Sequence, residues 1–197
     1  MAVVLTSSQD SLRHNVFRPH AFIVESSTSD NFKAMTGIAA SLVRDIALYL
    51  IALPALFVAL AIVRRRAWWG DLRAAALGGA FTIALVKIAG ALYFHERPFV
   101  VQHVAPLIAH APDNAFPSDH LAACGLAVAF LIGRDRPLAI LATLCAVAIG
   151  YARIAAALHW PIDIASGFAL GAAAMLAADA LLRYLFPERP GIALRER

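Results

Sequence analysis

Charged residues are scarce in this chain, and so is cysteine. Only 15% of the 197 residues are Asp, Glu, Lys or Arg, whereas 61% are hydrophobic. Soluble domains carry about 25% charged residues, so this composition excludes an ordinary soluble domain and indicates a membrane protein. The two cysteines, Cys124 and Cys145, both lie in apolar stretches. We expect each to be a small buried hydrophobe, not part of a disulfide or a metal site.

The first 33 residues also lack the basic segment, apolar core and cleavage site that together mark a signal peptide. We therefore expect the first apolar span to direct membrane insertion. The net charge of +4 would suggest nucleic-acid binding in a soluble protein. Most arginines, however, lie in short segments beside apolar stretches, where they report membrane topology. The expected partner is the bilayer, and nucleic acid is excluded.

Long apolar stretches predict an all-α, polytopic membrane bundle of five to six transmembrane helices. A helix needs roughly 20 residues to cross about 30 Å of hydrocarbon. Residues 1–44 form an N-terminal segment that we expect to lie partly in the interface, and whether it crosses is left open. Residues 45–186 form one transmembrane domain, and residues 187–197 form a cytoplasmic tail. The predicted spans lie near residues 45–63, 74–94, 120–133, 137–158 and 162–183.

Arginines follow the first, third and fifth predicted spans. By the positive-inside rule, these three segments face the cytoplasm. The loop over residues 95–119 and the turn over residues 159–161 then share the opposite face. The arginines that set this topology are Arg64, Arg65, Arg66, Arg73, Arg134, Arg136, Arg183, Arg189, Arg195 and Arg197.

Two polar clusters of that opposite face flank the loop. The first is Arg97-Pro98, with Lys87 ten residues earlier in an apolar helix, where a lysine either snorkels to the interface or faces a polar interior. The second is the turn over residues 116–120, which leads into the third span. Free N–H groups at a helix start favour an anion, although Ser118 or Asp119 as a plain N-cap would explain the turn as well.

A third cluster holds Arg153, then His159 six residues later and Asp163 four residues after that. Pro161 suits the first turn of a helix, so His159 lies just before that helix and Asp163 within its opening turn. Together the three clusters supply what phosphoryl transfer needs. Cations neutralise the phosphoryl oxygens, one imidazole attacks, another protonates the leaving oxygen, and a carboxylate orients the nucleophile.

These residues resemble the type 2 phosphatidic acid phosphatase superfamily of membrane lipid phosphatases. Its pattern is Lys-x6-Arg-Pro, then Pro-Ser-Gly-His, then Ser-Arg-x5-His-x3-Asp, and the likeness covers roughly residues 45–185. The resemblance implies that His159 becomes a phosphohistidine, that Asp163 holds and polarises it, and that His120 protonates the leaving group. It further implies that no metal or other cofactor is needed. The phosphate ligands that it implies are Arg97, Arg153 and Ser118.

The chain departs from this pattern in three places. Gly90 stands at the lysine position, and Lys87, one helical turn earlier on the same face, is a candidate replacement as phosphate ligand. Ala152 stands at the serine position. Asp119 stands at the glycine position, where a hydrogen bond to an arginine or to His120 would neutralise its effect on an anionic substrate. Further candidates beside the site are Pro117, Glu96 and His95, the last two as contacts to a diphosphate or lipid headgroup.

The turn over residues 116–120, together with Arg97-Pro98-Phe99, is similar to bacterial undecaprenyl diphosphate phosphatases linked to bacitracin resistance. That likeness implies hydrolysis of a phosphoric anhydride at the extracytoplasmic face of the bacterial inner (plasma) membrane, recycling the carrier lipid for cell-wall synthesis. Alternatives are a phosphatase or phosphotransferase acting on phosphatidate or phosphatidylglycerol phosphate, and a transporter that uses Lys87 and Arg153 as pathway residues. The oligomeric state is left open.

Other polar residues have plainer interpretations. His95, His103, His110 and Glu96 share a loop, but their spacing matches no pair of metal ligands on one helix face, so solvated loop histidines are expected. Asp179 and Arg183 lie four residues apart, which predicts an ion pair within one helix.

Overall fold

The computed structural model describes residues 37–46, 52–65 and 68–187. The chain divides into two units, Met1–Ala39 and Ala40–Arg197, and the helices below belong to the second. Residues 37–46 are helical. The rest of the predicted N-terminal segment, residues 47–51 of the first predicted span and residues 188–197 of the predicted tail lie outside the described residues.

Six labelled helices make up the second unit. The described residues contain no strand, so the prediction of an all-α membrane bundle is confirmed. By length and composition, α3, α6 and α7 suffice to cross a membrane, while α2 and α5 are shorter apolar helices of 13 and 14 residues. The helices are α2 (Ala52–Arg64), α3 (Trp68–Leu92), α4 (Pro98–Val101), α5 (Asp119–Ile132), α6 (Arg136–Ala155) and α7 (Pro161–Leu185).

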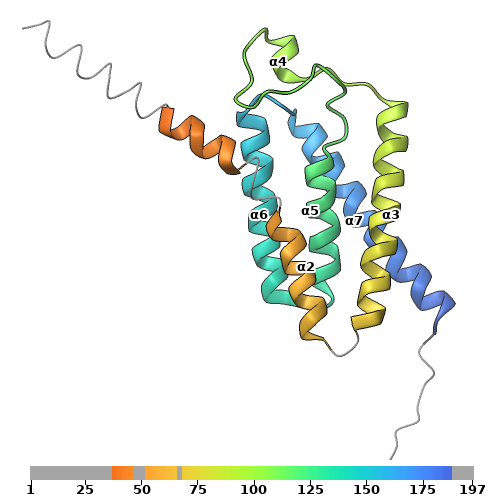
Figure 1. Ribbon diagram of the computed structural model, residues 1–197. Coiled ribbons are helices and arrows are strands. Elements are labelled where there is room, and N and C mark those ends of the chain that lie inside the picture. Colours follow the sequence, from red (N-terminus) through yellow and green to blue (C-terminus); the bar gives the residue numbers. More distant parts are fainter. Residues whose placement is uncertain (1–36, 47–51, 66–67, 188–197) are drawn as a thin grey trace, which may run out of the picture. The chain divides into compact units, whose positions relative to one another are not determined.

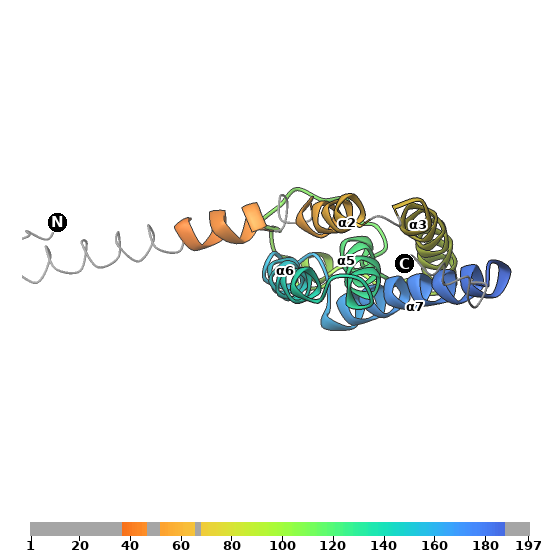
Figure 2. The same cartoon turned by 90° about the horizontal axis from the view of Figure 1, so that it is seen from below.

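Successive long helices run in opposite directions, so the connections gather at two ends of the bundle (Figure 1). At one end, called the loop end, residues 93–118 join α3 to α5 and residues 156–160 join α6 to α7. At the other, called the turn end, residues 133–135 join α5 to α6. Viewed along the bundle, α5 lies centrally and packs against α2, α3, α6 and α7 (Figure 2).

Helix boundaries follow local sequence signals, with one exception at the end of α6. Pro161 begins α7, and Asp135 caps α6 by accepting a hydrogen bond from the Leu138 N–H at 3.2 Å. The predicted span to residue 158 is too long, because α6 ends at Ala155. Ala157 there has a φ of 57°, which reverses the chain toward His159.

Glycines allow α5 and α7 to cross with their backbones in contact. A Cβ added to Gly171 would overlap the carbonyl oxygen of Ala122, and one added to Gly167 would overlap that of Ser118. Small residues at a crossing permit this close approach. The Ser118 N–H also donates to the Asp163 carbonyl at 3.1 Å. The first turns of α5 and α7 are thereby fixed against each other.

Arg134 joins three helices at the turn end. Its Nε donates to Asp71 of α3 at 2.8 Å, and its two terminal nitrogens donate to the two carboxylate oxygens of Asp179 of α7 at 2.8 and 3.0 Å. The predicted ion pair of Asp179 with Arg183 does not form among the described residues. A planar guanidinium binds both oxygens of one carboxylate at once, which makes Arg134 the better partner for Asp179.

Candidate functional site

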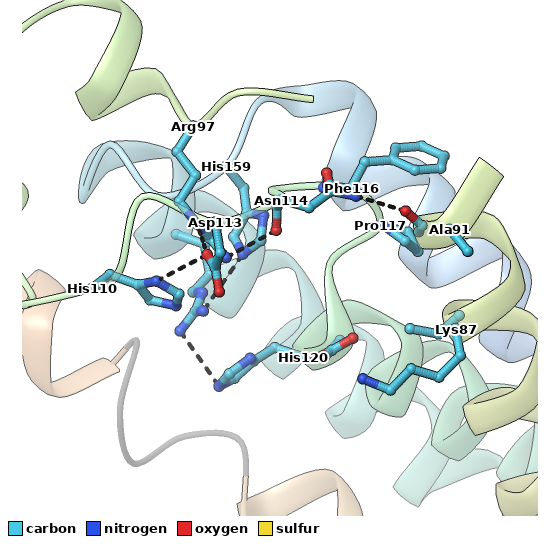
Figure 3. A pocket seen from close by; sticks show the side chains of 14 residues that line it. Lys87, Ala91, Arg97, His110, Asp113, Asn114, Phe116, Pro117, His120 and His159 are labelled. Carbon is cyan, nitrogen blue, oxygen red and sulfur yellow. Dashed lines mark hydrogen bonds and ion pairs between the residues drawn. The ribbon is translucent and has the colours of Figure 1, made fainter. Parts of the chain in front are cut away.

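A pocket of about 440 Å³ opens at the loop end, between α3, α5 and the segment before α5 (Figure 3). Of the predicted site residues, seven line it: Lys87, Arg97, Pro117, Asp119, His120, Arg153 and His159. Ser118 and Asp163 do not line it and are fully buried, at 0% exposure. His95 and Glu96 are not among the lining residues either. The three predicted clusters therefore meet in space.

His159 lies in the turn before α7 and is only 4% exposed. Its Nδ1 lies 2.9 Å from the carbonyl oxygen of Ala115. A carbonyl oxygen only accepts hydrogen bonds, so Nδ1 carries the proton and Nε2 keeps its lone pair. Nε2 lies 3.5 Å from a terminal nitrogen of Arg153, at the pocket. The nitrogen with an available lone pair at the pocket is therefore Nε2.

The environment of His159 keeps it neutral. Burial lowers the pKa of His159 to about 3, and the positive charges of Arg153 and Arg97 act in the same direction. The hydrogen bond to Ala115 opposes them but does not outweigh them. At pH 7 the imidazole is neutral, which is the form that can attack an electrophile.

Asp163 lies beside His159 but makes no hydrogen bond to it. The nearest approach is 3.9 Å, from Asp163 Oδ2 to His159 Nδ1. Asp163 instead accepts the Trp160 N–H at 2.8 Å and lies 2.7 Å from Nδ1 of His95. The reason is that His159 precedes α7, so the four-residue spacing does not place the two side chains on one helix face.

Arg153 lies between the two histidines that face the pocket. One terminal nitrogen lies 3.4 Å from Nε2 of His120, in the first turn of α5, and the other lies 3.5 Å from Nε2 of His159. Arg153 is 5% exposed, and its Nε has no hydrogen-bond partner among the described residues. An oxyanion held by this guanidinium would touch both imidazoles.

Arg97 is fixed by the chain around it. Its Nε donates to Asp113 at 2.7 Å, and its terminal nitrogens donate to the carbonyls of Leu158 at 2.9 Å and Asn114 at 3.2 Å. Burial would raise the pKa of Asp113, but the hydrogen bond and charge of Arg97 outweigh burial and lower it. Sequence reasoning missed Asp113 and Asn114, because a Pro-Asp-Asn run is typical of an ordinary turn.

Gly90, at the lysine position of the family pattern, lies against the segment before α5. A Cβ there would meet the Phe116 carbonyl oxygen at 3.2 Å, and the Asn114 side chain donates to the Gly90 carbonyl at 2.9 Å. A lysine at residue 90 would have to displace this segment. Lys87 lies one turn earlier and extends from α3 into the pocket on the side of His120 (Figure 3).

Ser118 and Asp119 begin α5 without acting as ordinary caps. Ser118 is the N-cap residue, but its side chain makes no capping hydrogen bond. Its buried Oγ has no hydrogen-bond partner among the described residues. Asp119 is exposed and lines the pocket; its carboxylate forms no ion pair within the described chain, but its charge acts on Arg153 and His120. A buried polar atom without a partner is costly unless a ligand supplies one.

The loop histidines do not gather at one point. His110 lines the pocket, with its Nδ1 3.6 Å from Asp113, whereas His95 binds Asp163. Over residues 37–46, 52–65 and 68–187, no three His, Cys, Asp or Glu side chains are grouped to hold a metal ion.

Comparison with known proteins places these residues in a wider group. Residues 71–187 match the PAP2 superfamily. The chain is 35% identical over 91 residues to the putative undecaprenyl-diphosphatase YbjG of Escherichia coli (strain K12), covering 46% of each chain. It is 38% identical over 96 residues to the bacitracin transport permease protein BcrC of Bacillus licheniformis, covering 47% of each.

A third relative is the undecaprenyl-diphosphatase BcrC of Bacillus subtilis (strain 168). It is 38% identical over 74 residues, which cover 37% of this chain and 38% of the relative. The chain therefore matches less than half the length of each of these three relatives.

The fold is shared with a solved transmembrane PAP2 type phosphatidylglycerolphosphate phosphatase from Bacillus subtilis. The TM-score is 0.55, and the likeness covers 86% of this chain and 91% of that one at 19% identity. At that identity the likeness establishes the fold alone.

Proposed function

The chain belongs to the PAP2 superfamily, and on that premise we propose that it hydrolyses undecaprenyl diphosphate to undecaprenyl phosphate. One observation carries the proposal: Arg153 lies within 3.5 Å of Nε2 of both His120 and His159. A phosphoryl group bound there has a neutral imidazole on one side and a second imidazole close to the leaving oxygen. Two relatives named undecaprenyl-diphosphatase support the choice of substrate.

The first step forms a covalent bond to the chain. His159 Nε2 attacks the terminal phosphorus, and the bond from that phosphorus to the bridging oxygen breaks. His120 gives its proton to that oxygen, and the lipid leaves as a monophosphate. Arg97, Arg153 and Lys87 line the pocket and would hold the transferred oxygens, so the negative charge meets preorganised donors, whereas the buried Ser118 does not line it.

The second step returns the site to its starting state. Water attacks the phosphohistidine, His120 accepts a proton from that water, and inorganic phosphate leaves as the P–N bond breaks. Phosphorylation at Nε2 puts positive charge on the His159 ring, whose Nδ1 lies 3.9 Å from the carboxylate of Asp163. This carboxylate stabilises that charge without taking the proton. Burial and the charge of Arg153 lower the pKa of His120, and Asp119 beside it only partly opposes them, so the negative charge of the bound substrate has to favour the protonated form that donation requires.

Below the pocket, an apolar groove of about 320 Å³ runs between α2, α3 and α5. It begins one helical turn deeper than the pocket, since Ile83 follows Lys87 down α3 and Ala123 follows His120 down α5. Its walls are almost wholly apolar, and Gly79 leaves open space above the α3 backbone. The groove suits the first isoprene units of a prenyl chain, with the remainder of the tail in lipid.

The proposed topology follows from the arginines. The turn end carries Arg65, Arg134 and Arg136 and would face the cytoplasm. The pocket then opens at the extracytoplasmic face of a bacterial plasma membrane, where released carrier diphosphate is recycled for wall synthesis. Residues 45–186 would form the phosphatase domain, with residues 1–44 partly interfacial and residues 187–197 cytoplasmic.

Two alternatives can be tested beside this proposal. A different lipid phosphate, such as phosphatidate or phosphatidylglycerol phosphate, would use the same histidines but not the prenyl groove. Transport, the role named for the Bacillus licheniformis relative, needs a polar path through the bundle. In the described bundle, a cluster of buried apolar residues near the turn end includes Phe130, Leu131 and Met175, which disfavours such a path.

The deciding experiment is phosphate release by the detergent-purified protein in EDTA, for the wild type and His159→Ala. We expect release from undecaprenyl diphosphate, much slower release from phosphatidate, and loss of activity in the variant. Rapid acid-free quenching should also trap phosphate on the wild type but not on the variant. Full activity of His159→Ala would exclude the phosphohistidine, and a preference for phosphatidate would exclude the prenyl substrate.

A further inference from the structure

His95 contacts both groups that surround His159. Its imidazole Nδ1 lies 2.7 Å from Oδ1 of Asp163, the fully buried carboxylate beside the nucleophile. Its main-chain carbonyl accepts the Ala115 N–H at 2.9 Å. The carbonyl of that same Ala115 accepts the Nδ1 proton of His159. One residue thus fixes both the carboxylate and the carbonyl on the Nδ1 side of the nucleophile.

The His95 ring is itself held in one orientation. It stacks on Trp160, with centroids 6.0 Å apart and an interplanar angle of 30°, and it also contacts Tyr93. The Trp160 indole N–H donates to the Glu96 carbonyl at 2.9 Å. The His95 main-chain N–H donates to the Asn114 side chain at 2.9 Å. The ring therefore presents Nδ1 to Asp163 and not to the pocket.

We propose that His95 is a positioning residue, which holds the Asp163 carboxylate 3.9 Å from His159 by donating its Nδ1–H to Oδ1. The other oxygen of Asp163, Oδ2, accepts the Trp160 N–H at 2.8 Å and lies 3.9 Å from Nδ1 of His159, too far for a hydrogen bond. Without the His95 donor, Oδ1 is left buried and unpaired, and the carboxylate turns toward another donor. That movement displaces the negative charge next to the phosphohistidine.

This role rests on the proposed function and deepens it. It assigns to His95 a different task from the substrate contact predicted from sequence, because the ring faces Asp163 and is not among the pocket-lining residues. A residue that orients a reacting group through one hydrogen bond typically changes rate by roughly 10- to 100-fold when that bond is lost. Its effect should fall on kcat, since it does not touch the substrate.

The test uses two amides that differ in where they place an N–H group. His95→Asn puts its amide nitrogen where Nδ1 lies, whereas His95→Gln puts it farther out, near the position of Nε2. We expect His95→Asn to keep kcat within about 3-fold and His95→Gln to lose roughly 10- to 100-fold in kcat with KM nearly unchanged. Steady-state phosphate release from undecaprenyl diphosphate measures both constants in the full chain.

A second measurement separates positioning from folding. Vanadate inhibition reports whether the pocket still binds an oxyanion, and thermal unfolding in detergent reports whether the bundle is intact. Equal kcat in the two amide variants would overturn the proposal, as would a rise in KM alone, which would make His95 a substrate contact. If both variants fail to fold, a purely structural role replaces the proposed one.

The same assay distinguishes this proposal from the one on which it depends. Wild type and His159→Ala run in parallel, and activity of His159→Ala equal to wild type would remove the phosphohistidine mechanism itself. Wild-type turnover that needs His159 but is indifferent to the His95→Gln change would overturn only the role of His95.

Discussion

Each end of the bundle holds an arginine between helices, half-buried Arg134 at one end and buried Arg153 at the other, and the two differ in the groups that neutralise their charge. At the turn end, Arg134 binds Asp71 and Asp179, and Arg65 binds the second oxygen of Asp71 at 2.8 Å. Burial would lower the pKa of Arg134, but these hydrogen bonds and charges raise it. At the loop end, Arg153 is bound to no carboxylate within the described chain, and its two terminal nitrogens lie 3.4 and 3.5 Å from the imidazoles of His120 and His159.

This difference distinguishes a structural arginine from a functional one. A buried cation that is neutralised by carboxylates of the same chain joins helices and does not attract an anionic ligand. A buried cation left without a carboxylate favours an anion from outside, and Arg153 also has a buried Nε without a hydrogen-bond partner among the described residues. Burial alone does not separate the two cases; the identity of the partner does.

Removing the unpaired arginine should have the largest effect on turnover. Arg153→Gln takes away the donor between the two histidines, and we expect kcat/KM to fall by about 10²- to 10³-fold. Stability should stay the same or rise, because a buried charge without a carboxylate is removed. Phosphate release and thermal unfolding on one preparation check both statements. A large fall in melting temperature with retained turnover would instead make Arg153 a structural arginine like Arg134.

Removing the paired arginine should do the opposite. Arg134→Gln leaves Asp71 and Asp179 without their shared counter-charge, which should cost roughly 3 kcal/mol of the free energy of unfolding. At temperatures where the variant stays folded, kcat should be nearly unchanged. Unfolding by SDS titration measures the first quantity, and Arg136→Gln, an exposed arginine at the same end, is the matched control. An inactive but stable Arg134→Gln would contradict this assignment.

The positive charges near His159 should also lower its pKa measurably. Because burial, Arg153 and Arg97 disfavour a second proton, the ¹⁵N signals of His159 should stay those of a neutral ring from pH 7 to about pH 4, protonating near pH 3. Arg153→Gln should raise the pKa of His159. His159→Asn identifies the signals. A ring that is protonated at pH 6 would contradict the neutral nucleophile.

The lowered pKa of His159 also makes the free energy of unfolding depend on pH. Between about pH 6.5, the ordinary value, and about pH 3, the unfolded chain binds a proton at His159 that the folded chain does not. The free energy of unfolding therefore falls as the pH is lowered through this window, and this contribution is fully present above it.

The smallest effect should come from the apolar stretch between the two ends. Gly79→Leu adds a side chain into the groove, where nothing lies within 4 Å of the new Cβ. We expect KM for undecaprenyl diphosphate to rise about 3-fold, since a few buried methylenes are lost from contact. Geranyl diphosphate, too short to reach residue 79, should be unaffected. Gly70→Leu, equally unhindered on the same helix but outside the groove, is the control.

Much of the fold could be predicted because charged residues mark the ends of the apolar stretches. The long span of α7 was predicted within two residues at each end, since Pro161 begins it and Arg183 lies near its close. The end of α6 was missed because Ala155 to Leu158 is apolar throughout, and nothing in that composition reveals a positive φ at Ala157. Composition reports burial, while a turn inside an apolar stretch is a matter of backbone geometry.

The site was predictable where side chains carry the chemistry and not where the backbone does. The sequence motif groups Arg153, His159 and Asp163, and these residues lie near one another in the structure, but the acceptor for the Nδ1 proton of His159 is the carbonyl of Ala115, which no sequence motif indicates. The glycine at the lysine position of the family pattern also has its explanation in the backbone, because the carbonyl of Phe116 lies against Gly90.

The backbone contact between α5 and α7 has a consequence for the enzyme in its membrane. Lateral pressure and bilayer thickness act on the lipid-facing side chains of a bundle, which can tilt or repack in response. The distance from His120 to His159 does not depend on those side chains, because Gly167 and Gly171 seat one helix directly on the backbone of the other. We therefore expect the catalytic geometry to be the same in lipids of different chain length, even where the outer surface of the bundle adapts.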